Sequence, residues 1–225
     1  MKIQTAQYFL LASLTVSLAA CEPRESAEAR TVETASVPQA SKAAAYRFVT
    51  SGDANAARYR IREQLVGVDF PNDAVGETKN VTGVISADSK GNVIPAESKF
   101  TVDVSNLTSD KDRRDGFVKR RVLETDQYPT VTLVPTKITG LSLPLPKSGS
   151  KSFDIIGDLT VRGVTHPTTW KVNANFQPTG FTGKAATAFT FRDFAIDQPR
   201  VPVVLSVADT IKLELDFSMI KEAKK

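Results

Sequence analysis

The sequence predicts an all-β fold in which about eight antiparallel strands close into a barrel, with one α-helix inserted at about 110–124. The main observation is the stretch 152–176, where apolar and polar side chains alternate on both sides of a turn bracketed by Gly163 and Pro167. Period-two alternation is typical of strands with one buried face, so the stretch predicts a hairpin with arms of about ten residues, each spanning roughly 30 Å. Arms of this length need a large curved sheet or a barrel to cover them.

Further alternating segments supply the remaining strands. Strands are expected at 58–65, 79–87, 98–107, 130–138, 181–194 and 209–219. Loops rich in turn-forming residues are expected at 71–78, 88–92, 141–150 and 198–202. Pro135 inside a predicted strand indicates an edge or a bulge. Closing eight strands on themselves would remove exposed edges and leave an interior just wide enough for one ligand.

The inserted helix is predicted where the period-two pattern stops. Apolar residues lie at helical spacing between Phe117 and Leu123. Ser109 followed three residues later by Asp112 indicates a capped helix start. Pro129 disfavours helical backbone at the residue before it and so marks the end.

The N-terminal segment predicts export. Residues 1–20 begin with a basic Lys2 and continue in a short apolar run, which has the length of a signal peptide and not of a membrane span. The sequence Leu-Ala-Ala-Cys ending at Cys21 resembles the bacterial lipobox, in which the cysteine is lipidated and becomes the mature N-terminus. The alternative is an ordinary signal peptide cut nearby, with Cys21 incidental. Cys21 is the single cysteine, so no disulfide within the chain is expected.

The domain organisation follows from composition. Residues 21–45 are predicted to be the lipidated cysteine and a tether, because this segment has no aromatic residue and cannot bury enough apolar surface to offset the entropy of ordering. Several acyl chains on Cys21 would give stable membrane anchoring. The folded domain is expected at 46–220, followed by a solvated tail at 221–225.

Charge and motif content argue against several classes of function. The net charge is +4 over 225 residues, without a run of five Lys or Arg, so no nucleic-acid partner is expected. His166 is the only histidine and is expected in an exposed turn, so no metal site is expected either. The sequence has no nucleophile elbow, P-loop or dinucleotide fingerprint, so it predicts neither a catalytic triad nor a cofactor.

The inward faces of the predicted strands carry an apolar set that has two interpretations. It lines a lipid tunnel, or it is the packed core of a filled barrel; both require the same chemistry. The set consists of Phe100, Val102, Val104, Leu159, Val161, Trp170, Val172, Phe189, Phe191, Leu213 and Leu215.

Charged residues near the predicted helix and the last strands are candidates for contacts at the barrel mouth. The candidates for contact with a ligand head group are Arg113, Arg114, Asp115, Arg192 and Asp193. The alternative for the helical group is a charge network on a solvated face. Asp193 could instead pair with Arg114 or Arg192 as a structural latch.

Three motifs resemble the YceI-like family. Residues 157–165 read GDLTVRGVT, which is similar to the family signature GDLT-x-x-GVT. Arg114-Asp115, followed by Leu123-Glu124-Thr125 and Tyr128-Pro129-Thr130, resembles the RD…L…YP segment of the family. The stretches 191–194 and 199–209 resemble its last strand pair, and together the matches span about 46–217 in family order. The lipobox, the tether and a longer loop at 141–150 depart from the pattern.

The resemblance implies a lipocalin-like barrel that holds a long polyisoprenoid or a similar amphiphile, without catalysis, for storage or transport in the bacterial cell envelope. The expected partners are therefore an isoprenoid-type lipid and, through the lipidated Cys21, a membrane. Glu22 in place of Asp after the cysteine favours the outer membrane, with the domain facing the periplasm. Dimers occur in the family, so the oligomeric state stays open.

Two other functions remain open at this point. A barrel-cyclase type of enzyme would need a buried acid with a perturbed pKa, and Asp158 and Asp193 are the candidates. A structural protein of the envelope, with a stress or interaction role, would have a filled interior and an exposed apolar patch.

Overall fold

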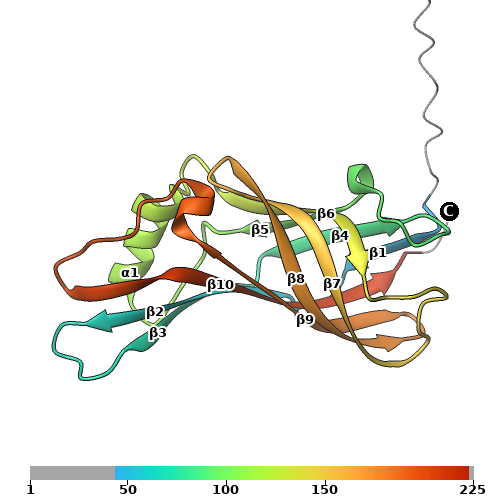
Figure 1. Ribbon diagram of the computed structural model, residues 1–225, viewed down its shortest axis with the longest axis horizontal. Coiled ribbons are helices and arrows are strands. Elements are labelled where there is room, and N and C mark those ends of the chain that lie inside the picture. Colours follow the sequence, from blue (N-terminus) through green and yellow to red (C-terminus); the bar gives the residue numbers. More distant parts are fainter. Residues whose placement is uncertain (1–43, 223–225) are drawn as a thin grey trace, which may run out of the picture. The chain divides into compact units, whose positions relative to one another are not determined.

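The structure is a computed structural model that describes residues 44–222 (Figure 1). The predicted signal peptide 1–20, the lipidation site Cys21, the predicted tether up to residue 43 and the last three residues of the tail lie outside the described residues. No helix within 44–222 is long and apolar enough to cross a membrane.

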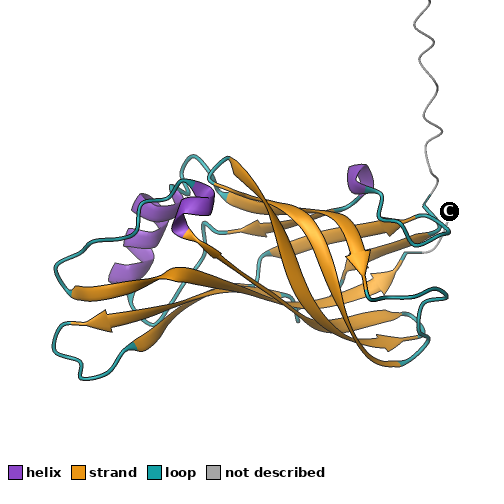
Figure 2. Cartoon of the chain, viewed as in Figure 1, coloured by secondary structure: helices purple, strands orange, loops and turns teal. Residues whose placement is uncertain are grey.

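Ten strands and four short helical segments make up this part of the chain (Figure 2). The strands are β1 (Tyr46–Thr50), β2 (Ala56–Leu65), β3 (Asn72–Thr78), β4 (Val81–Ala87), β5 (Lys99–Asp103), β6 (Thr130–Thr139), β7 (Gly149–Val161), β8 (Val164–Gln177), β9 (Gly180–Thr190) and β10 (Val204–Lys221). The helical segments are η1 (Pro95–Glu97), α1 (Asp112–Phe117), the π-helix η2 (Val118–Leu123) and η3 (Phe191–Phe194).

Eight of these strands form a closed antiparallel barrel, as predicted. The ring runs β1-β4-β5-β6-β7-β8-β9-β10, and β10 pairs back onto β1 with Thr50 opposite Met219 and Phe48 opposite Lys221. The ring closes because β10 is 18 residues long and can pair with two successive strands along one edge. β1 pairs with the C-terminal end of β10, and β2 pairs with the rest of β10, from Asp216 to Val204.

The hairpin β2–β3 therefore continues beyond the ring. β3 pairs with β2 along seven residues, and its one contact with the segment after β5 is a single bridge between Glu77 and Thr108. The barrel wall is thus incomplete at this end. The inserted helix, observed as α1 and η2 over 112–123, lies at the same end of the barrel as the β2–β3 hairpin (Figure 1).

The loop predicted at 71–78 is wrong, because the structure has the strand β3 there. Its inward residues are Ala74, Gly76 and Thr78, so the alternation is one of small side chains and carries little hydrophobic signal. The small size has a reason, because the ring of Tyr59 on β2 lies over Gly76. A Cβ at this glycine would fall 2.2 Å from the Tyr59 Cε1 atom.

The long hairpin β7–β8 is present, but its turn lies earlier than predicted. Val161 pairs with Val164, and the two turn residues Arg162 and Gly163 have φ angles of 49° and 74°, as a type I′ turn requires. His166 and Pro167 consequently lie inside β8. The sheet tolerates Pro167 because pairing with β9 begins at Lys171, so its missing N–H faces no ladder partner.

Three smaller predictions concern Pro135, the end of the strand expected at 181–194 and the start of the helix. Pro135 does lie at a bulge, where the β6–β7 register shifts before Lys137. The strand expected at 181–194 ends at Thr190, because the next four residues form η3. The helix start does not use the pair Ser109 and Asp112; Asp115 binds Ser109 instead, as described below.

Aromatic side chains cluster at the end of the barrel formed by β1 and β4. The rings of Phe48, Phe176 and Phe217 all pack on Phe181, with centroid distances of 5.0, 5.3 and 5.8 Å. Phe153 extends this cluster to β7, 6.5 Å from Phe176. We refer to this as the closed end.

Candidate functional site

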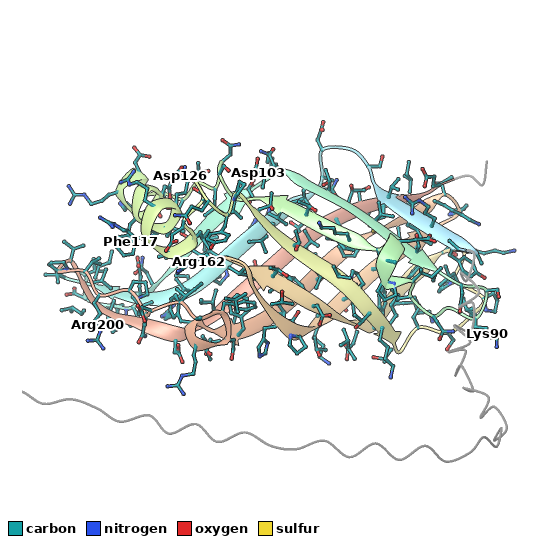
Figure 3. The ribbon with its side chains drawn as sticks, turned by 90° about the horizontal axis from the view of Figure 1, so that it is seen from above. Lys90, Asp103, Phe117, Asp126, Arg162 and Arg200 are labelled. Carbon is teal, nitrogen blue, oxygen red and sulfur yellow. The ribbon has the colours of Figure 1, made fainter. Side chains whose placement is uncertain are left out.

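The barrel contains a large apolar cavity. Its volume is about 800 Å³, within the range of about 300–1,000 Å³ that is typical of ligand pockets. At about 30 Å³ per heavy atom, this space holds roughly 25 atoms of a ligand. Exposed residues on α1 and on the loops before β3 and β10 line it at one end, so it reaches the surface there. We call this end the mouth; Figure 3 shows Phe117 and Arg200 toward it and Lys90 at the closed end.

A second cavity of about 230 Å³ lies toward the closed end. Four residues line both cavities and form a partition between them: Phe100, Leu133, Trp170 and Leu215.

Two aromatic rings dominate the partition, and both are held in place. The Trp170 Nε1 atom donates a hydrogen bond to Thr168 Oγ1 at 3.0 Å, and that hydroxyl donates to the Gly157 carbonyl oxygen at 3.2 Å. Phe100 lies flat over Gly83, where a Cβ would fall 2.1 Å from its Cδ1 atom. The missing side chain at Gly83 therefore makes room for the Phe100 ring. Both rings of the partition are thus held in place by the barrel around them.

The structure places the predicted apolar set around these two cavities. All of its members line the larger cavity except Val172, which lines the smaller one. Sequence reasoning missed the contribution of the inserted helix, which adds Phe117, Val118, Val122 and Leu123 to the larger cavity. The helical spacing of these residues was the available signal.

An ion pair between the helix and β2 provides a polar region in the apolar lining. The Arg114 Nη2 atom binds Glu63 Oε1, and these side chains are only 13% and 8% exposed. Arg114 also binds Asp110. Burial lowers the pKa of Arg114, but its hydrogen bonds to the two carboxylates outweigh burial and raise it. Both Arg114 and Glu63 line the larger cavity.

Tyr59 is the second polar element of this region, and sequence reasoning missed it. Its side chain lines the larger cavity, and its buried hydroxyl has no hydrogen-bond partner among the described residues. Burial raises the pKa of Tyr59 to about 12, so the hydroxyl keeps its proton at neutral pH. Within the described part of the chain, the hydroxyl is therefore an unpaired donor enclosed in the wall of the cavity, and it does not face the open space.

The other predicted mouth residues differ in position. Arg113 is exposed and lines the larger cavity together with Lys111. Asp115 is buried and does not line it; the backbone N–H of Ser109 donates to its two carboxylate oxygens at 2.9 and 3.0 Å, and the Ser109 hydroxyl donates at 2.6 Å. Asp115 thus fixes the start of the helix.

Arg192 and Asp193 lie on η3 and line neither cavity. The Thr190 N–H donates to Asp193 Oδ2 at 2.7 Å, and this hydrogen bond lowers the pKa of Asp193. The latch from Asp193 to Arg114 or Arg192 is not formed. The Asp193 Oδ1 atom instead lies 4.0 Å from the Nε2 atom of His166.

The two acids considered for catalysis do not face the interior. Asp158 is exposed on β7, and Asp193 caps η3. Neither lines the cavities, so neither supplies the buried acid that a barrel cyclase would need. Within residues 44–222, no three His, Cys, Asp or Glu side chains are grouped so that they could hold a metal ion.

Comparison with known proteins finds relatives that resemble this chain over most of its length. A UPF0312 protein of Pseudomonas putida strain F1 is 28% identical over 192 residues, covering 78% of this chain and 92% of its own length. A UPF0312 protein of Vibrio vulnificus strain YJ016 is 26% identical over 197 residues, covering 83% and 92%.

Two solved structures share the fold. A polyisoprenoid binding domain from Saccharophagus degradans, implicated in plant cell wall breakdown, superposes with a TM-score of 0.60 at 13% identity, covering 79% of this chain and 98% of its own. BcnA of Burkholderia cenocepacia superposes with a TM-score of 0.54 at 16% identity, covering 73% and 95%.

The glycines of the GDLTVRGVT motif have structural roles in this barrel. Gly157 faces the β6 bulge, where a Cβ would fall 2.7 Å from the Val134 carbonyl oxygen, and Gly163 completes the type I′ turn. The model of the YceI-like domain matches residues 46–219, from the start of β1 nearly to the end of β10. The resemblance seen in the three motifs thus extends over the whole barrel, and the chain belongs to the YceI-like family.

Proposed function

We propose that this protein binds a long apolar lipid of the polyisoprenoid type inside its barrel and does not act as an enzyme. The observation that carries the proposal is the cavity of about 800 Å³, which is lined mainly by apolar side chains and reaches the surface at the mouth. Membership in the YceI-like family and the fold shared with a polyisoprenoid binding domain support it.

The energetics favour a chain-like ligand. At about 0.8 kcal/mol per buried methylene, roughly 25 carbon atoms provide on the order of 20 kcal/mol of gross transfer free energy. Association and ordering remove an estimated 4–15 kcal/mol or more of this. The remainder of about 5–16 kcal/mol corresponds to a Kd between about 0.2 mM and the picomolar range.

The polar region orients the lipid. The ion pair of Arg114 and Glu63 gives the lining one charged region, beside which a polar end of the lipid lies. Arg113 at the mouth is available to an anionic head group. An amphiphile with one oxygen-bearing end therefore fits this cavity better than a plain hydrocarbon.

We also propose that the protein works in the bacterial cell envelope, held by a lipidated Cys21 and facing the periplasm at the outer membrane. The lipobox-like sequence and Glu22 support this proposal. Metabolic labelling with an alkyne fatty acid should mark the wild-type chain but not Cys21→Ser. Equal labelling of both chains would refute the anchor.

Extraction of the full-length protein from its native envelope, followed by mass spectrometry, tests lipid binding. We expect a prenyl lipid at a stoichiometry near one. Arg113→Gln removes only the exposed cation at the mouth, so it should bind an anionic prenyl lipid about tenfold more weakly while folding normally. Arg121→Gln, a change at an exposed arginine that lines neither cavity, serves as the matched control. A wild-type barrel that retains no lipid and binds none on reconstitution would refute the proposal.

A further inference from the structure

Exposed hydrophobic side chains gather at the mouth. Five of the seven large hydrophobic residues that are exposed within 44–222 lie on two adjacent segments, the β2–β3 loop and residues 203–205 at the start of β10. Their exposed fractions are 57% for Val66, 44% for Val68, 79% for Phe70, 53% for Val203 and 66% for Leu205. We call these five residues the hydrophobic tip.

The hydrophobic tip is a single, hydrogen-bonded surface. The Val66 N–H donates to the Val203 carbonyl oxygen at 3.1 Å, and Leu65 pairs with Val204 directly behind it. Within the loop, the Val68 N–H donates to the Leu65 carbonyl oxygen at 3.3 Å. These bonds hold the two segments together and place Val66 beside Val203.

The hydrophobic tip is continuous with the cavity. Val66, Val68 and Val203 are exposed on the surface and also line the larger cavity. An apolar path therefore runs from the outermost side chains into the barrel. Lys111 and Arg113 border the same mouth, and Asp69 is the one carboxylate within the loop 66–71.

The extent and position of this surface fit a lipid bilayer better than a protein partner. Five side chains of this kind expose on the order of 500 Å², less than the roughly 800 Å² per partner of a stable protein interface. A bilayer accepts a few inserted side chains without a complementary surface. Insertion would also place the mouth in contact with hydrocarbon, so that a lipid tail could pass into the cavity without crossing water.

We propose that the hydrophobic tip inserts into a lipid bilayer, so that the cavity opens into the membrane. The transfer of lipid through this contact rests on the proposed function, whereas insertion itself does not. Phe70 and Leu205 carry the insertion because they are the most exposed, and the basic residues at the mouth stay at the level of the head groups.

Co-flotation with vesicles tests insertion separately from lipid uptake. The chain without residues 1–20 and with Cys21→Ser is used throughout, so that neither the apolar signal segment nor an acyl anchor contributes. Vesicles of phosphatidylcholine and phosphatidylglycerol without any prenyl lipid are expected to bind this chain. Phe70→Ser combined with Leu205→Ser should lower the vesicle partition coefficient at least about tenfold. Ile220→Ser, which changes an exposed residue at the closed end, should leave it unchanged.

A second measurement reports insertion directly. Tryptophan in place of Phe70 should shift its emission to the blue with vesicles and be quenched by brominated acyl chains. Absent flotation, equal flotation of the double serine variant, or an unshifted tryptophan would overturn the proposal. So would a dimer that the same two serines dissociate without vesicles, because the hydrophobic tip would then be a self-association surface.

Vesicles that contain a polyprenol separate this inference from the proposed function. Flotation without polyprenol uptake would leave the bilayer contact standing and count against lipid binding. Polyprenol uptake by a protein that does not float with vesicles would support lipid binding and count against the bilayer contact.

Discussion

The partition between the two cavities predicts how long a bound lipid can be. Phe100 is 6% exposed and lines both cavities, so its ring separates the space at the mouth from the space at the closed end. Phe100→Ala should remove this barrier and join them. The larger cavity alone holds roughly 25 heavy atoms, or about five isoprene units.

The expected change follows from the volumes. The smaller cavity of about 230 Å³ has room for about eight atoms, and the vacated ring adds several more, so the joined space should accept about three additional isoprene units. Stability should fall by about 3–5 kcal/mol, the usual cost of truncating a buried Phe. Phe100→Leu should fill part of the space and give an intermediate result for both quantities.

Competition between polyprenols of graded length, read by native mass spectrometry, measures the effect. Urea denaturation first establishes that the variants are folded. Phe189→Ala is the matched control, because this ring lines only the larger cavity and its loss cannot join the two. If folded Phe100→Ala prefers the same chain lengths as the wild type, the partition does not set ligand length and the reasoning is refuted.

Three further predictions concern stability. Arg114→Ala leaves Glu63 buried without its cation and should lower the free energy of unfolding in urea by about 3–5 kcal/mol. Replacing both residues by Met should recover most of this loss. An equal loss in the single and the double variant would contradict a buried ion pair. The pKa of Asp193 is lowered in the folded state, so its stabilisation is present above its unfolded value near 3.8 and is lost as pH falls through the folded value. Asp193→Ala should thus lose about 1 kcal/mol at pH 7 and show a smaller drop in Tm than wild type between pH 5 and 2 in calorimetry; parallel curves would contradict this. At Gly183 a Cβ would lie 2.3 Å from a backbone oxygen of β8, so Gly183→Ala should lower the free energy of unfolding strongly. Gly52→Ala is the comparison, because nothing lies within 4 Å of a Cβ there and only the positive φ angle opposes the change, at about 1 kcal/mol. Gly183→Ala should therefore have much the larger effect.

The barrel could be predicted from the sequence because most of its strands bury one face. β8 alternates over its full length and β7 alternates from Phe153 to Val161, and the observed pairing of the two strands follows that alternation. β3 could not be found in this way, since its inward residues are selected for small size beneath Tyr59. The turn of the long hairpin was misplaced because Pro167 was taken as a turn residue, whereas Arg162 and Gly163 adopt the positive φ angles.

The candidate site was only partly predictable for a different reason. Period two identifies which side chains point inward, but it does not distinguish a filled core from a cavity, since the difference depends on how far opposite walls stand apart. The ion pair of Glu63 and Arg114 joins residues that are 51 positions apart, and no local pattern links them. A weak signal existed in β2, where Glu63 occupies an inward position of the same alternation as Tyr59 and Ile61.

The length of β10 has a practical consequence for anyone who handles this protein. β1 joins the C-terminal end of β10, and the Glu222 N–H donates to the Arg47 carbonyl oxygen at 2.9 Å, so both ends of the described chain emerge beside each other at the closed end. The mouth lies beside Val204, roughly 50 Å away at about 3.3 Å per residue of strand. Fluorophores or a sensor surface attached beside Tyr46 or Lys221 will therefore leave the mouth unobstructed, so binding at the mouth can be measured on an immobilised barrel.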